Sequence, residues 1–344
     1  MNRLKVLVAM SGGVDSSVAA AVLRDQGHDV TGVTLKLWGG ASDSGCCSVS
    51  DVEDARRVAA QLDLPHYVFN FADEFATRVV EPYVASYAAG RTPNPCIECN
   101  RSIKWGRLYE RARTMGFDAM ATGHHARRTV DAHGVPELRR GADPRKDQSY
   151  VLAGLERSQL TTTLLPVGEM TKADVRAHAA RLGLRTATKA ESMDVCFITR
   201  GGRMTFLDER VPAVPGAIVD VAGAVVGRHD GVRAFTVGQR RGLAVATGER
   251  SYVLDVDATT ATVTLGRAED LARDRVDVAD VTFTGEPVAI GTRVEAQVRA
   301  HGAPAAGTWG GDHVIWDVPQ PRVAPGQTVA LYDGDRVLSA GIAT

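Results

Sequence analysis

Hydrophobic and polar positions divide the chain into two regions of different character. Up to about residue 125, short apolar runs alternate with longer segments in which apolar residues recur every three or four positions. The runs 4–9, 30–37, 66–71 and 117–121 predict strands, and segments starting near residues 14, 51, 73 and 171 predict helices. Within the third run we expect Tyr67, Phe69 and Phe71 to face the core. Alternating strands and helices indicate an α/β fold, a parallel sheet with helices on both faces.

After about residue 202 the helical periodicity disappears, and short β-branched runs are separated by Gly, Pro and Asp. Runs such as 217–220, 224–227 and 251–255 predict a central β-rich unit, and about five short strands after residue 279 predict a small barrel. We therefore expect three domains. They are 1–202 with the α/β sheet, 203–278 rich in β structure, and 279–344 as a C-terminal β-barrel.

Composition is ordinary for a globular protein, with 44% hydrophobic and 24% charged residues in a chain of 344. No run of roughly 18 apolar residues suggests a membrane span, and the first strand follows Met1 so closely that we expect no signal peptide. These features predict a cytoplasmic protein without a membrane partner. The formal net charge of −1 means that a nucleic acid would have to meet a local basic surface.

The most specific pattern follows the first predicted strand and reads Ser11-Gly12-Gly13-Val14-Asp15-Ser16. Its glycines allow a sharp turn and close approach to a ligand, while its hydroxyls and the N–H groups of a helix start suit a phosphate. The pattern matches neither of the two commonest nucleotide-binding motifs, G-x-x-x-x-G-K-[ST] and G-x-G-x-x-G. Leu35 and Gly123 follow other strands to the same sheet edge, where parallel sheets bind ligands. Leu35 fits an adenine contact and core packing equally well.

Cys96 and Cys99 form a C-x-x-C pair just before a predicted helix. A helix start favours the thiolate form of Cys99, and the positive charges of Arg101, Lys104 and Arg107 favour it further. Zinc binding is a competing, weaker interpretation, because a structural site needs four ligands and the sequence has no second C-x-x-C or H-x-x-H pair. We expect Ile103, Trp105 and Leu108 to form the apolar side of this helix.

Other polar positions are less informative when each is considered alone. Cys196 fits a small buried side chain, and the adjacent Cys46 and Cys47 suggest neither a metal nor a redox role. The pair His124 and His125, at the end of a predicted strand, favours a site over a structural role.

Four stretches in one order resemble a known family: 11–17, 92–100, 122–126 with 146–150, and 192–197. The first resembles the pyrophosphate-binding loop of the PP-loop ATP pyrophosphatases. Together the four resemble the bacterial tRNA-specific 2-thiouridylases, and 235–243 matches the central domain of that family. The resemblance covers nearly the whole chain and is weakest after about residue 279.

The resemblance implies an ATP-dependent tRNA sulfurtransferase. ATP would adenylate the C2 oxygen of a wobble uridine and release pyrophosphate. A donor protein, either a cysteine desulfurase or a sulfur-relay carrier, would leave a persulfide on Cys196, and Cys99 would be the nucleophile. The product would be 2-thiouridine, with AMP released and a transient disulfide between Cys99 and Cys196. Mg²⁺ would bridge the ATP phosphates, with Asp15 as a possible partner and no certain metal ligand.

The resemblance also assigns binding residues. For ATP they are Ala9, Met10, Ser11, Gly12, Gly13, Val14, Asp15, Ser16, Leu35 and Gly123. For the target base they are Asn94, Pro95 and Cys96, and for the rest of the tRNA they are His124, Lys146, Asp147, Gln148, Arg299, Ala300 and Gln327. Many relatives have an acidic residue in place of Cys96 and a tyrosine in place of His125.

Two other functions remain possible from the residues alone. Another PP-loop enzyme could adenylate a small molecule, as a ligase or an amidotransferase does, but this leaves Cys99 and Cys196 without a use. A non-catalytic RNA-binding protein with a zinc-stabilised C-x-x-C would bind zinc and release no pyrophosphate.

Overall fold

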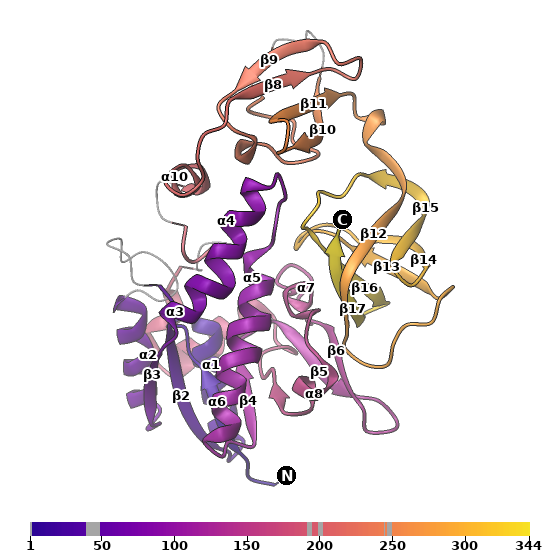
Figure 1. The fold of residues 1–344 in the computed structure, drawn as a ribbon. Coiled ribbons are helices and arrows are strands. Elements are labelled where there is room, and N and C mark those ends of the chain that lie inside the picture. The colour runs from indigo at the N-terminus through magenta and orange to yellow at the C-terminus, as the bar shows by residue number, and fades with distance from the viewer. Residues whose placement is uncertain (1, 39–48, 191–194, 199–201, 244, 246–249) are drawn as a thin grey trace.

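The computed structural model describes residues 2–38, 49–190, 195–198, 202–243, 245 and 250–344. Figure 1 shows an α/β domain that carries the N-terminus, a small sheet above it, and a barrel beside it that contains the C-terminus. Cys46 and Cys47 lie outside the described residues. In the described part of the chain, no helix has the length and apolar character needed to span a membrane.

The N-terminal sheet is parallel and has the strand order β3-β2-β1-β4-β7. Its strands are β1 (Lys5–Ala9), β2 (Asp29–Lys36), β3 (His66–Asn70), β4 (Ala119–Thr122) and β7 (Thr163–Leu164). The structure confirms the four strands expected from the apolar runs, with small shifts at their ends, and adds the short β7. The predicted α/β class is therefore confirmed.

Helices cover both faces of this sheet (Figure 1). The described helices up to Asp208 are α1 (Val14–Asp25), α2 (Val49–Gln61), α3 (Ala72–Phe75), the π-helical η1 (Ala76–Val80), α4 (Glu81–Ala88), α5 (Pro95–Glu98), the π-helical η2 (Cys99–Leu108), α6 (Tyr109–Thr114), α7 (Ser149–Leu152), α8 (Arg157–Thr161), α9 (Lys172–Arg181), the 3-10 helix η3 (Arg185–Thr188) and α10 (Gly202–Asp208), of which α10 lies away from the sheet. Alternate residues of β1 enter different cores, with Leu7 in one and Val6 and Val8 in the other. This two-sided burial explains why β1 is an unbroken apolar run.

The glycine loop lies at the point where the strand order reverses. β1 pairs with β2 on one side and with β4 on the other, so that Ala9 lies opposite both Val33 and Thr122. The connection from β1 continues through α1 to β2, while β4 follows much later in the chain. Ligands of open α/β sheets bind at the carboxyl ends of the strands at such a reversal.

The second unit is a four-stranded sheet in the order β10-β11-β8-β9. Its strands are β8 (Gly216–Val219), β9 (Val225–His229), β10 (Tyr252–Asp257) and β11 (Thr262–Gly266), and the 3-10 helix η4 (Val232–Ala234) follows β9. Ile218, Val253 and Val263 are fully buried in its core. The predicted β-rich central unit is confirmed.

The third unit is a closed barrel of six strands, which confirms the predicted barrel. In order around the barrel they are β12 (Ala272–Phe283), β15 (His313–Pro321), β14 (Ala305–Trp309), β13 (Arg293–Gln297), β16 (Thr328–Asp333) and β17 (Arg336–Ala343), and β17 pairs again with β12. A 3-10 helix, η5 (Glu269–Leu271), leads into it. β12 runs through residue 278, where the sequence suggested a domain boundary, and the two boundaries between the three domains remain predictions.

A hairpin from the first domain joins the sheet of the barrel. It consists of β5 (Ala126–Val130) and β6 (Pro136–Arg140), and Arg139 of β6 pairs with Arg336 of β17. The Asp335 carboxylate accepts from Arg127 and Arg139, each at 2.6 Å. The hairpin therefore fixes the barrel against the domain that carries the glycine loop.

One expectation about the core is wrong. Phe69 and Phe71 are buried, but Tyr67 is half exposed. β3 is the edge strand of the sheet, and Phe69 is the one residue of this strand that is buried. Ile103, Trp105 and Leu108 are buried, as the sequence predicts.

Candidate active site between the glycine loop and the cysteine segments

The glycine loop is held in shape by its own hydroxyl groups. The Ser11 amide donates to Ser16 Oγ at 3.1 Å, and the Ser17 hydroxyl donates to the Gly13 carbonyl at 2.8 Å. Gly13 is the N-cap of α1 and has no side chain to satisfy the first amide groups of the helix. The first turn therefore presents N–H groups, which together with the helix dipole favour an anion.

Asp15 lies in this first turn, between the Lys172 ammonium group and the His125 imidazole ring. Lys172 Nζ lies 2.7 Å and 2.8 Å from its two carboxylate oxygens, and His125 Nε2 lies 3.0 Å from one of them. Burial by itself would raise the pKa of Asp15, but the hydrogen bonds from His125 and Lys172 outweigh it and hold that pKa below its ordinary value. Asp15 is therefore a carboxylate at neutral pH.

A second lysine lies on the other side of the loop. Lys189 Nζ donates to the Gly12 carbonyl at 3.0 Å, to Asp51 at 2.6 Å and to Asp54 at 2.7 Å. Burial opposes the charge, but the two carboxylates hold the pKa of Lys189 above its ordinary value. Two ammonium groups thus flank a loop that is suited to phosphate.

The sequence reasoning assigned no function to Lys172 or Lys189. Lys172 is the first residue of α9, where a cation opposes the helix dipole. That unfavourable position is the local signal that could have identified it. Lys189 carries no such signal, because its partners Asp51 and Asp54 are far away in the sequence.

Two of the three glycines assigned to ATP binding allow backbone segments to pack closely. Gly12 has φ +72°, and a Cβ there would lie 2.3 Å from the Asp51 carbonyl oxygen. A Cβ at Gly123 would lie 2.4 Å from Ser16 N. Gly123 therefore brings the end of β4 against the start of α1, a packing requirement that exists without ligand. Leu35 is 7% exposed and packs in a hydrophobic core.

The C-x-x-C pair lies at the start of one long helical segment. The Asn94 side chain accepts from the Cys96 amide at 3.1 Å and caps α5, which continues into η2 at Cys99. Cys99 is buried, and Cys96 is partly exposed. The loop before the pair is held by both β units, because Gln327 Nε2 donates to the Thr92 carbonyl at 2.8 Å and the Thr92 hydroxyl donates to Thr236 at 3.2 Å.

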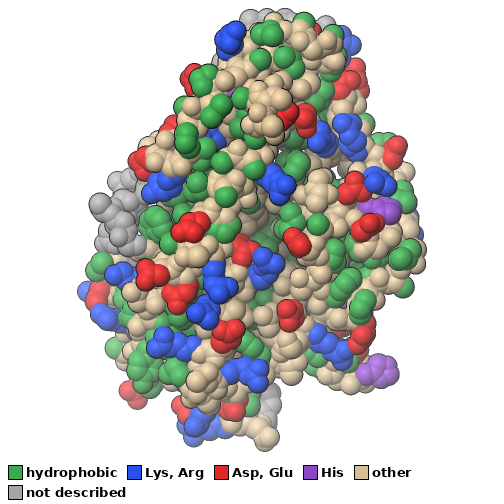
Figure 2. All heavy atoms as spheres, viewed as in Figure 1, with side chains coloured by type: hydrophobic (Ala, Val, Ile, Leu, Met, Phe, Trp, Pro, Cys, Tyr) green, Lys and Arg blue, Asp and Glu red, His purple; other side chains and the backbone are tan. Residues whose placement is uncertain are grey.

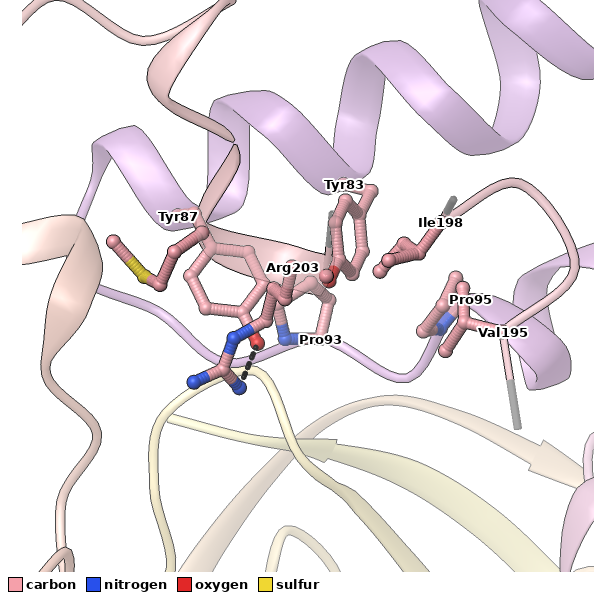
Figure 3. Close-up of a pocket in the computed structure, with 9 residues that line it drawn as sticks. Tyr83, Tyr87, Pro93, Pro95, Val195, Ile198 and Arg203 are labelled. Atoms are coloured by element: carbon pink, nitrogen blue, oxygen red, sulfur yellow. Dashed lines mark hydrogen bonds between the residues drawn. The ribbon is translucent and has the colours of Figure 1, made fainter. Parts of the chain in front are cut away.

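A pocket of about 500 Å³ joins the two cysteine segments (Figure 3). Pro95, next to Cys96, and Val195, next to Cys196, both line it. The other labelled lining residues are Tyr83, Tyr87, Pro93, Ile198 and Arg203, and Arg203 donates to the Tyr87 hydroxyl at 3.2 Å. Cys196 is partly buried and packs against the hydrophobic cluster that contains Cys99. The structure thus brings the two cysteine segments, far apart in sequence, to one region.

Several residues assigned to tRNA also hold the protein together. The His125 amide donates to Gln148 Oε1 at 2.8 Å, and Asp147 accepts from Arg140 at 3.0 Å. His124 Nδ1 lies 2.8 Å from the Thr122 hydroxyl. Burial, together with the positive charge of Lys104, holds the pKa of His124 well below its ordinary value, so its ring is neutral at pH 7.

The remaining assigned residues come from separate elements. Lys146 is partly exposed beside Asp147. Arg299 and Ala300 follow β13, and a Cβ at Gly238 of the central unit would lie 3.7 Å from Arg299 Nη2. Among the described residues, no group of three or more His, Cys, Asp or Glu side chains is arranged to hold a metal ion. Figure 2 shows Lys and Arg side chains interspersed with acidic ones over one face, without a single basic field.

A parallel sheet with an S-G-G-x-D-S loop at its reversal point, joined to two β units, defines the class as a PP-loop α/β protein. Family models agree along the chain. Residues 4–200 match the tRNA methyl transferase HUP domain, 204–267 match its PRC-barrel domain, and 273–343 match the aminomethyltransferase beta-barrel domain.

Curated relatives specify the family. The tRNA-specific 2-thiouridylase MnmA of Cutibacterium acnes is 46% identical over 351 residues, which cover 98% of this chain and 95% of the relative. The protein of the same name from Frankia casuarinae is 47% identical over 352 residues and 98% of each chain. The chain therefore belongs to the tRNA-specific 2-thiouridylase family, which confirms the resemblance seen in its motifs.

Solved structures resemble the chain more distantly. A 4-thiouridine synthetase in an RNA complex with bound ATP is 19% identical, with a TM-score of 0.39, and the match covers 61% of this chain and 46% of that one. The U34-tRNA thiolase NcsA of Methanococcus maripaludis is 18% identical, with a TM-score of 0.37, covering 61% and 64%.

Proposed function

We propose that this protein is a tRNA 2-thiouridylase that uses ATP to replace the C2 oxygen of a wobble uridine by sulfur, in the cytoplasm. The observation that carries the proposal is similarity over nearly the whole chain to the 2-thiouridylases. It is supported by one pocket that Pro95 and Val195 line, each next to a cysteine of a different segment. A ligase or amidotransferase acting on a small molecule would need the glycine loop but has no use for Cys99 and Cys196.

In the first half of the reaction, the glycine loop binds the ATP phosphates. The N–H groups of the first turn of α1 face the phosphates, and Lys172 and Lys189 stabilise the negative charge of the leaving pyrophosphate. The uridine C2 oxygen attacks the α-phosphorus, and the bond to pyrophosphate breaks. The adenylated oxygen then becomes a good leaving group.

We propose that Mg²⁺ enters with ATP. Asp15, Asp51 and Asp54 bring three carboxylates to the loop, against the two ammonium groups of Lys172 and Lys189. The triphosphate adds further negative charge, and carboxylate and phosphate oxygens are the ligands that Mg²⁺ prefers. Bound Mg²⁺ would offset the charge on the phosphates, and Asp15, in the first turn of α1, is a candidate to hold it.

In the second half, sulfur is transferred from Cys196. A donor protein leaves a persulfide on Cys196, and its terminal sulfur attacks C2 of the adenylated base as AMP leaves. The Cys99 thiolate then attacks Sγ of Cys196, breaks the sulfur–sulfur bond and releases the thiolated base. The resulting Cys99–Cys196 disulfide needs a dithiol reductant before the next cycle. In an equivalent route, Cys99 attacks the persulfide first and hydrogen sulfide attacks C2.

The test is nucleoside analysis of unmodified tRNA incubated with the protein, ATP, Mg²⁺ and a cysteine desulfurase with cysteine. We expect 2-thiouridine and tRNA-dependent pyrophosphate release from the wild type, and no 2-thiouridine from Cys99→Ser or Cys196→Ser. Both variants should still bind ATP, which separates loss of sulfur transfer from loss of folding. Full thiolation by Cys196→Ser with the persulfide donor contradicts the mechanism. Pyrophosphate release without tRNA would favour a small-molecule substrate instead.

A further inference from the structure

A largely buried polar cluster joins the first domain to the barrel, and we call it the Arg140 junction. Its members are Arg140, Asp147, Ser149, Gln297 and Tyr332. Arg140 Nη1 donates to Asp147 at 3.0 Å and to Gln297 Oε1 at 2.9 Å. The guanidinium lies 3.8 Å from the centre of the Tyr332 ring. Arg140 thus contacts Asp147, in a loop of the first domain, and two strands of the barrel, β13 and β16.

The barrel side of the junction fixes a segment assigned to tRNA. Gln297 is 4% exposed, and its Nε2 donates to the carbonyl oxygens of Arg299 at 2.9 Å and Ala300 at 3.2 Å. Its Oε1 is already held by Arg140. The backbone at Arg299 and Ala300 is therefore oriented by a side chain that Arg140 itself orients.

The other side fixes the second assigned segment. Asp147 Oδ1 accepts from the amides of Gly141 at 2.9 Å and Ser149 at 3.0 Å, while Oδ2 accepts from the Ser149 hydroxyl at 2.9 Å. The Ser149 and Tyr332 hydroxyls lie 3.1 Å apart, which closes the cluster. Burial raises the pKa of Tyr332 to about 12, so its hydroxyl keeps its proton. Connected hydrogen bonds between buried groups restrict how those groups can be arranged, and here they reach Arg140 through Nη1, while its buried Nη2 has no hydrogen-bond partner.

We propose that Arg140 and Gln297 are positioning residues. They hold Arg299–Ala300 at a fixed position relative to Lys146–Gln148, so that the two segments bind tRNA as one surface. The proposal rests on the proposed function. Arg140 itself touches no substrate in this mechanism. Gln148, next to Asp147, links this cluster to the glycine loop. Its side chain accepts from the His125 amide, and the His125 ring contacts Asp15. The tRNA surface is thereby held at a fixed position relative to the glycine loop.

The first test replaces Arg140 by lysine. Arg140→Lys keeps the charge but removes the planar guanidinium, which stacks on Tyr332 while its Nη1 donates to both Asp147 and Gln297. We expect the tRNA Kd, measured by filter retention, and the KM for tRNA to rise about tenfold, the effect of losing one charge-assisted hydrogen bond. The kcat at saturating tRNA and the ATP affinity without tRNA should stay unchanged. Arg139→Lys is the matched control, because Arg139 lies on the same hairpin but pairs with Asp335 and Glu137.

A second test separates positioning from general loosening. Gln297→Glu keeps an acceptor for Arg140 and removes the donor to the carbonyls of Arg299 and Ala300, so the tRNA Kd should rise by a similar factor. In an Arg299→Ala background, Gln297→Glu should add little, because both changes act through the Arg299–Ala300 segment. If the two increases in the tRNA Kd multiply in the double variant, or if Gln297→Glu leaves the Kd unchanged, the proposal is wrong. A wild type that binds tRNA but makes no 2-thiouridine rejects the proposed function, while the Kd series still tests the junction.

Discussion

Replacing Gly123 by alanine tests why this glycine is needed. The new Cβ would lie 2.4 Å from Ser16 N and 2.6 Å from the Asp15 carbonyl carbon, whereas real Cβ contacts essentially never fall below 3.0 Å. Both neighbours are backbone atoms in the first turn of α1, so no change of rotamer can relieve the clash. Either β4 or the start of α1 must move.

The expected cost follows from that displacement. Forcing an extra carbon into a packed interior costs about 1–3 kcal/mol. For a unit of about 200 residues, each kcal/mol lowers the unfolding temperature by about 2–4 °C. Because the displaced atoms belong to Asp15 and Ser16, the affinity for ATP should fall as well.

Thermal unfolding without nucleotide is the deciding assay. Gly154→Ala is the matched control, because a Cβ there meets nothing within 4 Å and no positive φ strains it. We expect Gly123→Ala to unfold at a clearly lower temperature and Gly154→Ala to stay close to the wild type. If Gly123→Ala unfolds like the control and loses only ATP affinity, the glycine serves ligand approach and the packing argument is refuted.

Two further predictions concern Asp15. Lys172→Met removes the ammonium 2.7 Å from its carboxylate, and kcat for pyrophosphate release should fall about tenfold to a hundredfold, as expected for a hydrogen bond to a charged group. Lys5→Met, at an exposed lysine, is the control, and equal rates in the two variants would exclude a role for Lys172. The second prediction is for pH. Because folding lowers the pKa of Asp15 from 3.8, the stability from its carboxylate is present above about pH 4 and lost as pH falls through the lower folded value. Denaturant unfolding of the wild type and Asp15→Asn should therefore converge in acid, and a gap that widens there contradicts this assignment.

The sequence predicts the parallel sheet well because its signals are local. Strands buried on both faces are continuous apolar runs, and the glycine loop depends on residues adjacent in the chain. The β5–β6 hairpin is missed because its residues 126–130 and 136–140 are polar and rich in arginine. Its stability comes from Asp335 and from the edge of β17, about 200 residues away. No window along the sequence contains that partner.

In the candidate site, too, local motifs identify residues, whereas contacts between residues far apart in the chain could not be predicted from the sequence. Resemblance to a family identifies positions, but the structure shows how their polar atoms are used. Gln148 binds the His125 backbone, Asp147 holds Arg140, and Gln327 donates to the Thr92 carbonyl. A substitution at any of these residues would disturb the protein before it removed a contact with tRNA. Weaker tRNA binding in such a variant would therefore not prove direct contact. Arg299 is the more direct probe, because the junction fixes its backbone rather than its guanidinium.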